Sequence, residues 1–169
     1  MRGIAMAVYA TMNSPVGELL LTGELGPDGL ALDSVSMSGG KKTPAVGDRT
    51  AAPEAFTEVI AQLNDYFAGE RTHFDLEYTT GGTDFQRRVW QAVDEIPYGT
   101  TVGYGRIAEQ IGASRAAVRA VGTAIGANPL LIVRPCHRVV GANGALTGYA
   151  GGLDNKRVLL DLEYARRTA

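Results

Sequence analysis

Residues 104–128, YGRIAEQIGASRAAVRAVGTAIGAN, decide how the second half of this chain folds. Apolar residues recur at helical spacing on both sides of a Gly-Ala-Ser break, so we expect a short helix closed by Gly112 and a second helix capped by Ser114. The core face of the second helix would consist of Val118, Val121 and Ile125. Two short helices joined by a tight turn are typical of a helix-turn-helix.

The face of the second helix that turns away from this core is suited to a DNA groove. Arg115, Arg119 and Gly122 lie at positions i, i+4 and i+7 among alanines. Small residues let a helix backbone approach a surface closely, and arginine adds charge and reach. A helix face exposed to water has the same composition, so this pattern alone leaves both interpretations open.

Residues 134–141, RPCHRVVG, contain the only cysteine of the chain. A lone cysteine is either a small buried residue, its usual fate, or a nucleophile. Pro135 favours a stiff, extended backbone, on which Cys136 and His137 point to opposite faces. A contact between thiol and imidazole would therefore need a bend or a bridging water. The polar, glycine-rich surroundings of the thiol favour the nucleophile.

The first half of the chain has the pattern of strands followed by a helix. Interrupted apolar runs predict a hairpin over 8–24 and a further strand over 29–37. A loop over 38–52, rich in Gly, Pro, Ser and Thr, is expected to be mobile. An apolar stripe at helical spacing predicts a helix over 53–69, and residues 73–78 predict a short strand.

A linker at 79–83, TTGGT, separates this part from a mainly helical second half. Thr83, with Gln86 three residues later, predicts a capping box for a helix that ends before Pro97. Near the end of the chain Asp154 is expected to cap a last helix, whose inward side chains would be Val158, Leu159 and Leu162.

Composition and charge favour a globular cytoplasmic protein. Hydrophobic residues make up 45% of the 169 and charged residues 20%, and no apolar run approaches the roughly 20 residues that cross a membrane. No secretory signal is evident, and a single free thiol persists in a reducing compartment. Residues 1–83 carry five Lys/Arg against eleven Asp/Glu, whereas 84–169 carry eleven against seven. The second half could therefore meet an anionic partner.

Residues 119–163, RAVGTAIGANPLLIVRPCHRVVGANGALTGYAGGLDNKRVLLDLE, resemble the active-site region of the O6-alkylguanine-DNA alkyltransferases, the methylated-DNA–protein-cysteine methyltransferases. The PCHRV core carries the resemblance together with the preceding RAVG and Asn-Pro and the following GYAGG. It continues through residues 85–112, FQRRVWQAVDEIPYGTTVGYGRIAEQIG. The first half is similar only loosely, through residues 65–76, DYFAGERTHFDL.

This resemblance implies an α+β fold in two domains. Residues 1–80 would form an RNase H-like α/β domain, and residues 84–169 a mainly helical, winged-helix-like domain with the helix-turn-helix. The implied activity is direct-reversal DNA repair by a single-turnover suicide transferase, which moves the alkyl group of O6-alkylguanine, and of O4-alkylthymine, to Cys136. Nucleotide flipping is physically reasonable because O6 lies inside a stacked duplex.

The resemblance also implies the catalytic roles. Cys136 would attack the alkyl carbon, and His137 would act through a water to generate the thiolate. Glu163 would orient the histidine. Asn128 would hold the helix and the cysteine segment together by hydrogen bonds.

On the DNA side, the resemblance implies that Arg119 fills the stack left by the flipped nucleotide. Tyr104 would promote rotation of the nucleotide's phosphate. The other DNA-binding positions would be Gln86, Ala120 and Gly122. The substrate pocket would be lined by Val139, Tyr149 and the loop from Ala150 to Lys156.

Three positions depart from the family pattern. Gly103 and Ala150 stand where many or some relatives have serine, which bears on pocket selectivity. Arg134 stands where an aliphatic residue is common; it either aids thiolate formation or pairs with an acid. The chain lacks the cysteines of the zinc site of some relatives, so we expect no metal and no cofactor. The partner would be alkylated double-stranded DNA and no membrane, bound by a monomer, with cooperativity along DNA left open.

Other classes remain as alternatives. A non-catalytic alkyltransferase-like protein would bind lesions but usually has tryptophan in place of the cysteine. A cysteine hydrolase would need a labile acyl-enzyme, and a redox enzyme would need a resolving thiol that this chain lacks. A transcription regulator that uses the helix-turn-helix alone is a fourth class. Mass spectrometry after reaction with O6-methylguanine duplex would separate the alkyl acceptor from the other three.

Overall fold

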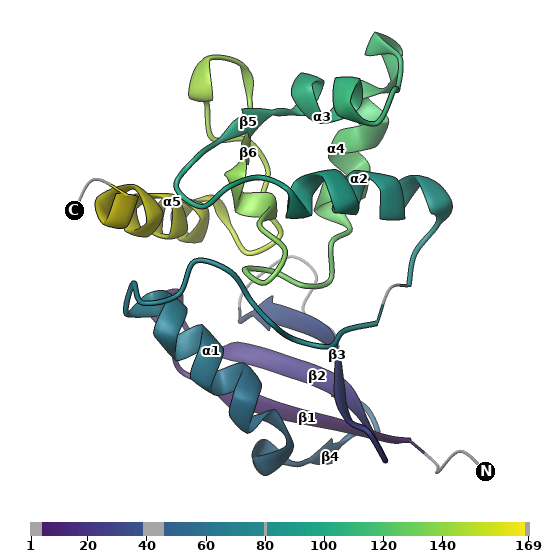
Figure 1. Ribbon diagram of the computed structural model, residues 1–169, viewed down its shortest axis with the longest axis vertical. Helices are drawn as coiled ribbons and strands as arrows, with labels where there is room; N and C mark the ends of the chain where they lie inside the picture. The colour runs from purple at the N-terminus through teal and green to yellow at the C-terminus, as the bar shows by residue number, and fades with distance from the viewer. Residues whose placement is uncertain (1–4, 39–45, 80, 168–169) are drawn as a thin grey trace.

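The computed structural model describes residues 5–38, 46–79 and 81–167, and it has a sheet with one covering helix below a helical half (Figure 1). The sheet has the strand order β3-β2-β1-β4. β1 (Met6–Met12) and β2 (Leu19–Gly26) form the predicted antiparallel hairpin, and β3 (Gly29–Met37) continues it. The short β4 (Thr50–Ala51) runs parallel to β1 at the opposite edge. Residues 39–45 of the predicted mobile loop lie outside the described residues, and Thr50 and Ala51 near its end form β4 instead of loop.

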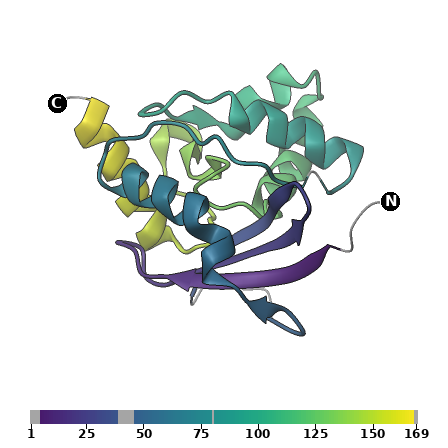
Figure 2. The ribbon, with the colours of Figure 1, turned by 60° about the horizontal axis from the view of Figure 1, so that its bottom comes forward.

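One face of the sheet is covered by α1 (Thr57–Phe67), which follows a 3-10 turn, η1 (Pro53–Phe56) (Figure 2). The predicted stripe is the reason: Phe56, Val59, Leu63 and Tyr66 are all buried against the sheet and its neighbours. Gly69 ends the helix with a φ of 77°, a backbone conformation that costs glycine little. The helix predicted over 53–69 is therefore confirmed over 57–67, whereas residues 53–56 form the 3-10 turn.

The short strand predicted at residues 73–78 is wrong. This segment is extended, but it makes only an isolated bridge, between Tyr78 and Leu32 on the free edge of β3. Leu32 donates its N–H to the Glu77 carbonyl and accepts the N–H of Thr79, each at 2.9 Å. Residues 73–78 thus cover the edge of β3 without forming a strand of their own.

The second half consists of short helices around two small strands. α2 (Asp84–Asp94) begins with the predicted capping box: Thr83 Oγ1 accepts the Gln86 N–H at 3.1 Å, and Gln86 Oε1 accepts the Thr83 N–H at 2.9 Å. The helix-turn-helix consists of α3 (Tyr104–Gln110) and α4 (Val118–Gly126). The remaining elements are β5 (Val102–Gly103), which is parallel to β6 (Val139–Val140), three 3-10 turns, η2 (Arg115–Ala117), η3 (Cys136–Arg138) and η4 (Ala142–Gly144), and α5 (Leu153–Arg167).

Two predicted helix starts need correction. Ser114 makes no side-chain capping bond, and the 3-10 turn η2 precedes α4, so the second helix of the pair is shorter than the sequence predicts. α5 begins at Leu153, which places Asp154 inside its first turn. Val158, expected to face inward, is 39% exposed, whereas Leu159 is fully buried.

The two halves share one apolar core, which includes residues of the sheet, α1, α2, α4 and α5. The free edge of β3 faces the second half, where Val35 donates its N–H to the Pro129 carbonyl at 2.9 Å and accepts the Leu131 N–H at 3.1 Å. The predicted α+β class is confirmed. The sheet edge also fixes the chain just before the cysteine segment.

Candidate active site

The thiol lies on a tight turn instead of the predicted extended backbone. Ile132 has a φ of 71°, an uncommon conformation for a β-branched residue, and the Arg134 N–H bonds the Leu130 carbonyl at 2.9 Å. The 3-10 turn η3 then carries Cys136, which is 4% exposed. The prediction of an extended backbone is wrong because the Arg134 N–H bond before Pro135 and the 3-10 turn after it both bend the chain. The chain is therefore bent at Cys136, which is one of the two conditions under which the thiol and the His137 imidazole can interact.

Asn128 connects the end of α4 to this turn. Its Nδ2 donates to Cys136 Sγ at 3.2 Å and to the carbonyls of Leu130 and Arg134 at 3.3 and 3.4 Å. Its Oδ1 accepts the Leu130 N–H at 3.0 Å. One buried amide thus holds the helix, the loop and the thiol in a single arrangement.

His137 and Glu163 form a buried pair, with Nε2 of the imidazole 2.6 Å from Oε2 of the carboxylate. Burial would raise the pKa of Glu163, but hydrogen bonds and charge from His137 and Arg138 lower it to about 2, so the carboxylate is ionised and only accepts. The proton between the two residues therefore belongs to Nε2. Burial also lowers the pKa of His137, which leaves a neutral imidazole whose Nδ1 lone pair has no partner among the described residues.

Three further groups hold the Glu163 carboxylate, and the sequence did not single out any of them. Arg138 donates Nε to Oε1 at 2.7 Å and Nη2 to Oε2 at 3.1 Å. Tyr66 of α1 donates its hydroxyl to Oε2 at 2.6 Å, and the Gly99 N–H reaches Oε1 at 3.2 Å. Tyr66 was hidden in the apolar stripe of its helix. Arg138 had a signal in the PCHRV segment, where a cation follows the histidine directly.

Two opposing effects act on the pKa of the Cys136 thiol. Burial raises the pKa of Cys136 to about 11, although the Asn128 hydrogen bond and the charges of Lys156 and Arg134 lower it in part. At neutral pH the resting group is therefore a thiol. A base must remove its proton before it can act as a nucleophile, and a neutral imidazole with an unpaired Nδ1, as at His137, is a base in its chemistry.

A cavity of about 260 Å³ opens onto the thiol. Tyr104 and Gly122 form its helix-turn-helix side, and Tyr149 with Ala150 form the opposite loop. Ile125, Gly126 and Gly148 also line it, although the sequence did not single them out for the site. The Tyr149 hydroxyl is buried without a partner among the described residues, and burial followed by the charge of Cys136 raises its pKa. An unsatisfied donor and a nucleophile therefore lie beside the same space.

Val139 and Lys156 were predicted to line the substrate pocket, but neither lines this cavity, because Lys156 is drawn into bonds with backbone carbonyls, including that of Val139. Lys156 is fully buried, and its Nζ donates to the carbonyls of Val139 and Thr147 at 2.6 and 2.8 Å and to that of Gly148 at 3.4 Å. Burial lowers the pKa of this amine, while the charge of Cys136 raises it. Its three bonds fix the loop that carries Tyr149 and Ala150.

The five predicted DNA-facing residues do not share one surface. Arg119 and Ala120 are exposed on α4, and Arg119 lies about one turn from Gly122, which lines the cavity together with Tyr104. Tyr104 accepts a hydrogen bond from Thr147 Oγ1 at 3.3 Å. Gln86 lies elsewhere, at the start of α2, where its side chain is used in the capping box.

Two features are absent from the described ranges 5–38, 46–79 and 81–167, a metal-binding cluster and a membrane-spanning helix. No three His, Cys, Asp or Glu side chains in them are grouped to hold a metal ion. No helix there has both the length and the apolar character needed to cross a bilayer.

Comparisons with known proteins match nearly the whole length of the chain. The family described as "6-O-methylguanine DNA methyltransferase, DNA binding domain" matches residues 84–165, and its "ribonuclease-like domain" matches residues 7–79. The methylated-DNA–protein-cysteine methyltransferase of Mycobacterium tuberculosis is 51% identical over 164 residues, 97% of this chain and 96% of the relative. That of Methanosarcina acetivorans is 50% identical over 92% of this chain and 97% of its own.

A solved structure agrees with these sequence matches. The crystal structure of Mycobacterium tuberculosis OGT in complex with DNA is 50% identical, with a TM-score of 0.85 and 94% of each chain covered. The resemblance seen around PCHRV is thereby confirmed over both halves. This chain belongs to the 6-O-methylguanine DNA methyltransferase family, the methylated-DNA–protein-cysteine methyltransferases.

Proposed function

We propose that this protein repairs DNA by moving the alkyl group of O6-alkylguanine, and of O4-alkylthymine, to Cys136. The observation that carries the proposal is a buried thiol on the wall of a cavity of about 260 Å³, bonded by Asn128 and adjacent in sequence to an imidazole with a free Nδ1. A nucleophile, a base and an enclosed space for a nucleobase are the three parts that the transfer needs.

The reaction follows from the protonation states. His137 Nδ1 takes the Cys136 proton through a bridging water, and Glu163 stabilises the imidazolium because its carboxylate stays ionised. The thiolate then forms a sulfur–carbon bond as the carbon–oxygen bond to O6 breaks. The electron pair stays on guanine, which takes up the proton held by His137. The products are unmodified guanine and S-alkyl-Cys136.

We assign the DNA side to the helix pair on the cavity rim. The exposed Arg119 lies one helical turn from Gly122, so it can occupy the stack that a flipped nucleotide vacates. Tyr104, at the mouth of the cavity, would contact the rotated phosphate. Ala120 and Gly122 let the backbone approach, and Gln86 would contact DNA from the start of α2.

The proposal also covers the domains of the protein, its compartment and its oligomeric state. Residues 1–80 would be one domain and residues 84–169 the DNA-binding and alkyl-acceptor domain. The protein would act as a cytoplasmic monomer on double-stranded DNA, because the reaction needs a reduced thiol and a stacked lesion, and one chain holds every group named above.

Stoichiometry tests this function. A thioether does not release its alkyl group, and the chain has no second cysteine to receive it, so each chain should react once. With protein limiting, repair of O6-methylguanine duplex should stop when one methyl group per chain is bound, and peptide mass spectrometry should find it on Cys136. Cys136→Ser should bind the duplex and remain unmodified. Continued turnover, or methylation at another residue, would refute the proposal; an unmodified wild type that still binds lesions would favour the alkyltransferase-like alternative.

A further inference from the structure

Arg134 is a buried cation whose partners lie on two sides of the thiol turn. Its side chain is only 6% exposed, yet it immediately precedes Pro135 and Cys136. A buried guanidinium needs its charge and its donors satisfied, and each contact that does so restrains its position.

On its outer side Arg134 is held by an acid and two aromatic rings. Nε lies 3.3 Å from Asp94 Oδ1 at the end of α2. The guanidinium carbon lies 4.9 Å from the ring centre of Trp90 and 5.5 Å from that of Tyr78, which are cation–π distances. Trp90 is itself fixed, because its indole N–H donates to the Ala124 carbonyl of α4 at 2.8 Å.

On its inner side Arg134 bonds the amide that bonds the thiol. Its Nη1 lies 3.3 Å from Asn128 Oδ1, which also accepts the Leu130 N–H. Both neighbours of Oδ1 are donors, so a flipped amide would place its NH₂ group against two N–H groups. The flip is thereby excluded, and Nδ2 must face Cys136 Sγ, 3.2 Å away.

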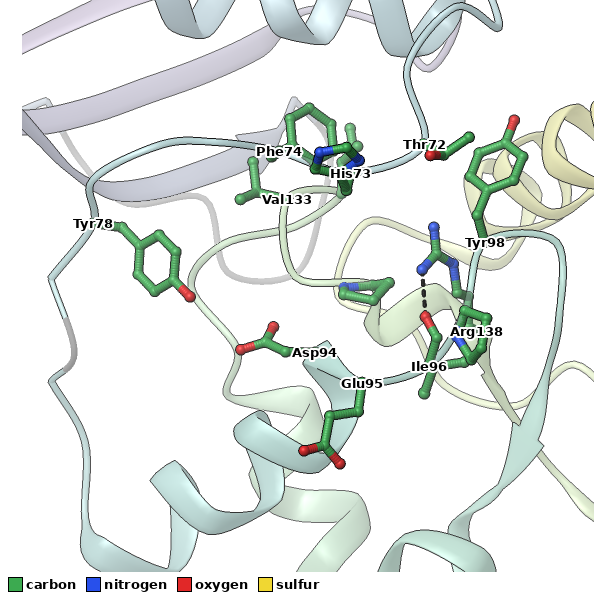
Figure 3. Close-up of a pocket in the computed structure, with 13 residues that line it drawn as sticks. Thr72, His73, Phe74, Tyr78, Asp94, Glu95, Ile96, Tyr98, Val133 and Arg138 are labelled. Carbon is green, nitrogen blue, oxygen red and sulfur yellow. Dashed lines mark hydrogen bonds between the residues drawn. The ribbon is translucent and has the colours of Figure 1, made fainter.

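The acid that pairs with Arg134 is more exposed to water than Arg134 itself. Asp94 is 35% exposed and lies on the wall of a second cavity, of about 390 Å³, together with Tyr78 (Figure 3). This cavity shares no lining residue with the one at the thiol. Water screens the carboxylate more than the guanidinium, so the pair leaves a net positive field on the thiol side.

We propose that Arg134 is a positioning residue that locks the Asn128 amide toward Cys136 and adds positive charge in favour of the thiolate. The inference rests on the proposed alkyl transfer. Among the described residues, the other charged or titratable groups around the thiol are Lys156 from α5, which lies behind the cavity loop, Tyr149 on that loop, Tyr104 on the opposite wall of the cavity, and His137 with the Glu163 carboxylate and Arg138. Arg134 alone among them contacts the amide that bonds the sulfur.

Arg134→Met tests the proposal because methionine keeps length and apolar contact while it removes the charge and the donors. The matched control is Arg49→Met. Arg49 also pairs with an acid, Asp33, at 3.1 Å and bonds the Val8 and Gly23 carbonyls, but these partners lie on β3, β1 and β2 and none belongs to the thiol turn. Free O6-benzylguanine is the probe, since it requires no DNA binding, and single-turnover rates are measured from pH 6 to 10.

We expect R134M to react about tenfold more slowly at neutral pH, with a pH–rate profile displaced upward by about one unit, and R49M to keep the wild-type profile. A wild-type rate in R134M, or a loss with no displacement, would overturn the proposal. If R134M does not unfold cooperatively, Arg134→Lys is used instead, because lysine keeps the charge without the planar fork of donors. A reaction rate about threefold below that of the wild type supports the positioning role, and a wild-type rate refutes it.

A second probe separates this inference from the proposed function. Methyl methanethiosulfonate modifies a thiolate without any guanine, and the chain has one cysteine, so the mass increase reports that residue alone. A slower, displaced reaction in R134M supports the role of Arg134 even if the wild type fails to accept a benzyl group. If the wild type is alkylated and R134M reacts with the thiosulfonate at the wild-type rate, the inference about Arg134 is refuted and the proposed function stands.

Discussion

Glu163→Gln removes the charge on which the site is centred. The carboxylate accepts from His137, Arg138, Tyr66 and the Gly99 N–H while its side chain is 1% exposed. Glutamine has the same shape, but it is neutral and presents one oxygen and one NH₂ group. It therefore cannot accept from all four donors, and it leaves the Arg138 guanidinium buried without a counter-charge.

The size of the effect follows from the pKa of Glu163. The gap between an ordinary glutamate, 4.5, and the value of about 2 here corresponds to about 3 kcal/mol of folding stability at neutral pH. Loss of one partner of a buried ion pair also costs about 3–5 kcal/mol, which is the same range. Because the folded pKa is depressed, this stability is complete above pH 4.5 and is lost as the pH falls through 2.

Urea unfolding of both proteins at pH 7 and pH 3 checks the prediction. We expect E163Q to be less stable by about 3 kcal/mol at pH 7, and the difference to shrink by about 2 kcal/mol at pH 3, where part of the wild-type contribution is gone. Alkyl transfer should slow by about a hundredfold, because the imidazolium loses its support. A stability difference that is the same at both pH values would refute the assignment of the ionised carboxylate to the buried pair.

Two further predictions concern the groups on either side of this centre. Tyr66→Phe should lower the unfolding free energy in urea by about 2 kcal/mol, because a hydroxyl bond to a buried carboxylate is lost. Tyr98→Phe is its control, since the buried Tyr98 hydroxyl has no hydrogen-bond partner in the described structure; equal losses in both variants would contradict the role of the bond. Arg119→Ala should slow repair of O6-methylguanine duplex in single-turnover assays by about tenfold while its reaction with free O6-benzylguanine stays unchanged. Equal slowing on both substrates would place Arg119 in the pocket or the fold.

Local signals in the sequence predicted the fold well where neighbours along the chain determine the structure. The capping box of Thr83 and Gln86 involves residues three apart, and the hairpin of β1 and β2 follows from alternation and a turn. The errors fall where distant contacts decide. The segment 73–78 alternates like a strand, but only Leu32 of β3 is available to pair with Tyr78. Ser114 has the right identity for a cap, and yet the 3-10 turn after it leaves its side chain unused.

In the candidate site, too, some residues were predicted from the sequence and others were not. The resemblance supplied Cys136, His137, Glu163 and Asn128, and the structure brings these residues together. It could not supply the donors that set their protonation, because Tyr66 is 97 positions from Glu163 and Arg134 is 40 positions from Asp94. Polar contacts between residues so far apart leave no periodicity in a single sequence. They become visible only when α1, α2 and α5 are packed around the thiol turn.

This packing links the first half of the chain to the site, although none of its residues in the described ranges 5–38 and 46–79 lines the thiol cavity. The edge of β3 bonds Pro129 and Leu131, directly after the Asn128 amide, and Tyr66 of α1 reaches the carboxylate that orients His137. The acceptor segment is thereby braced at its start by the sheet and at its base by α1. A buried thiol with a raised pKa depends on exact placement of the amide and the imidazole to become reactive, since neither exposure nor resting charge makes it so. The acidic first half therefore serves as the rigid support against which the basic, DNA-facing half holds its nucleophile.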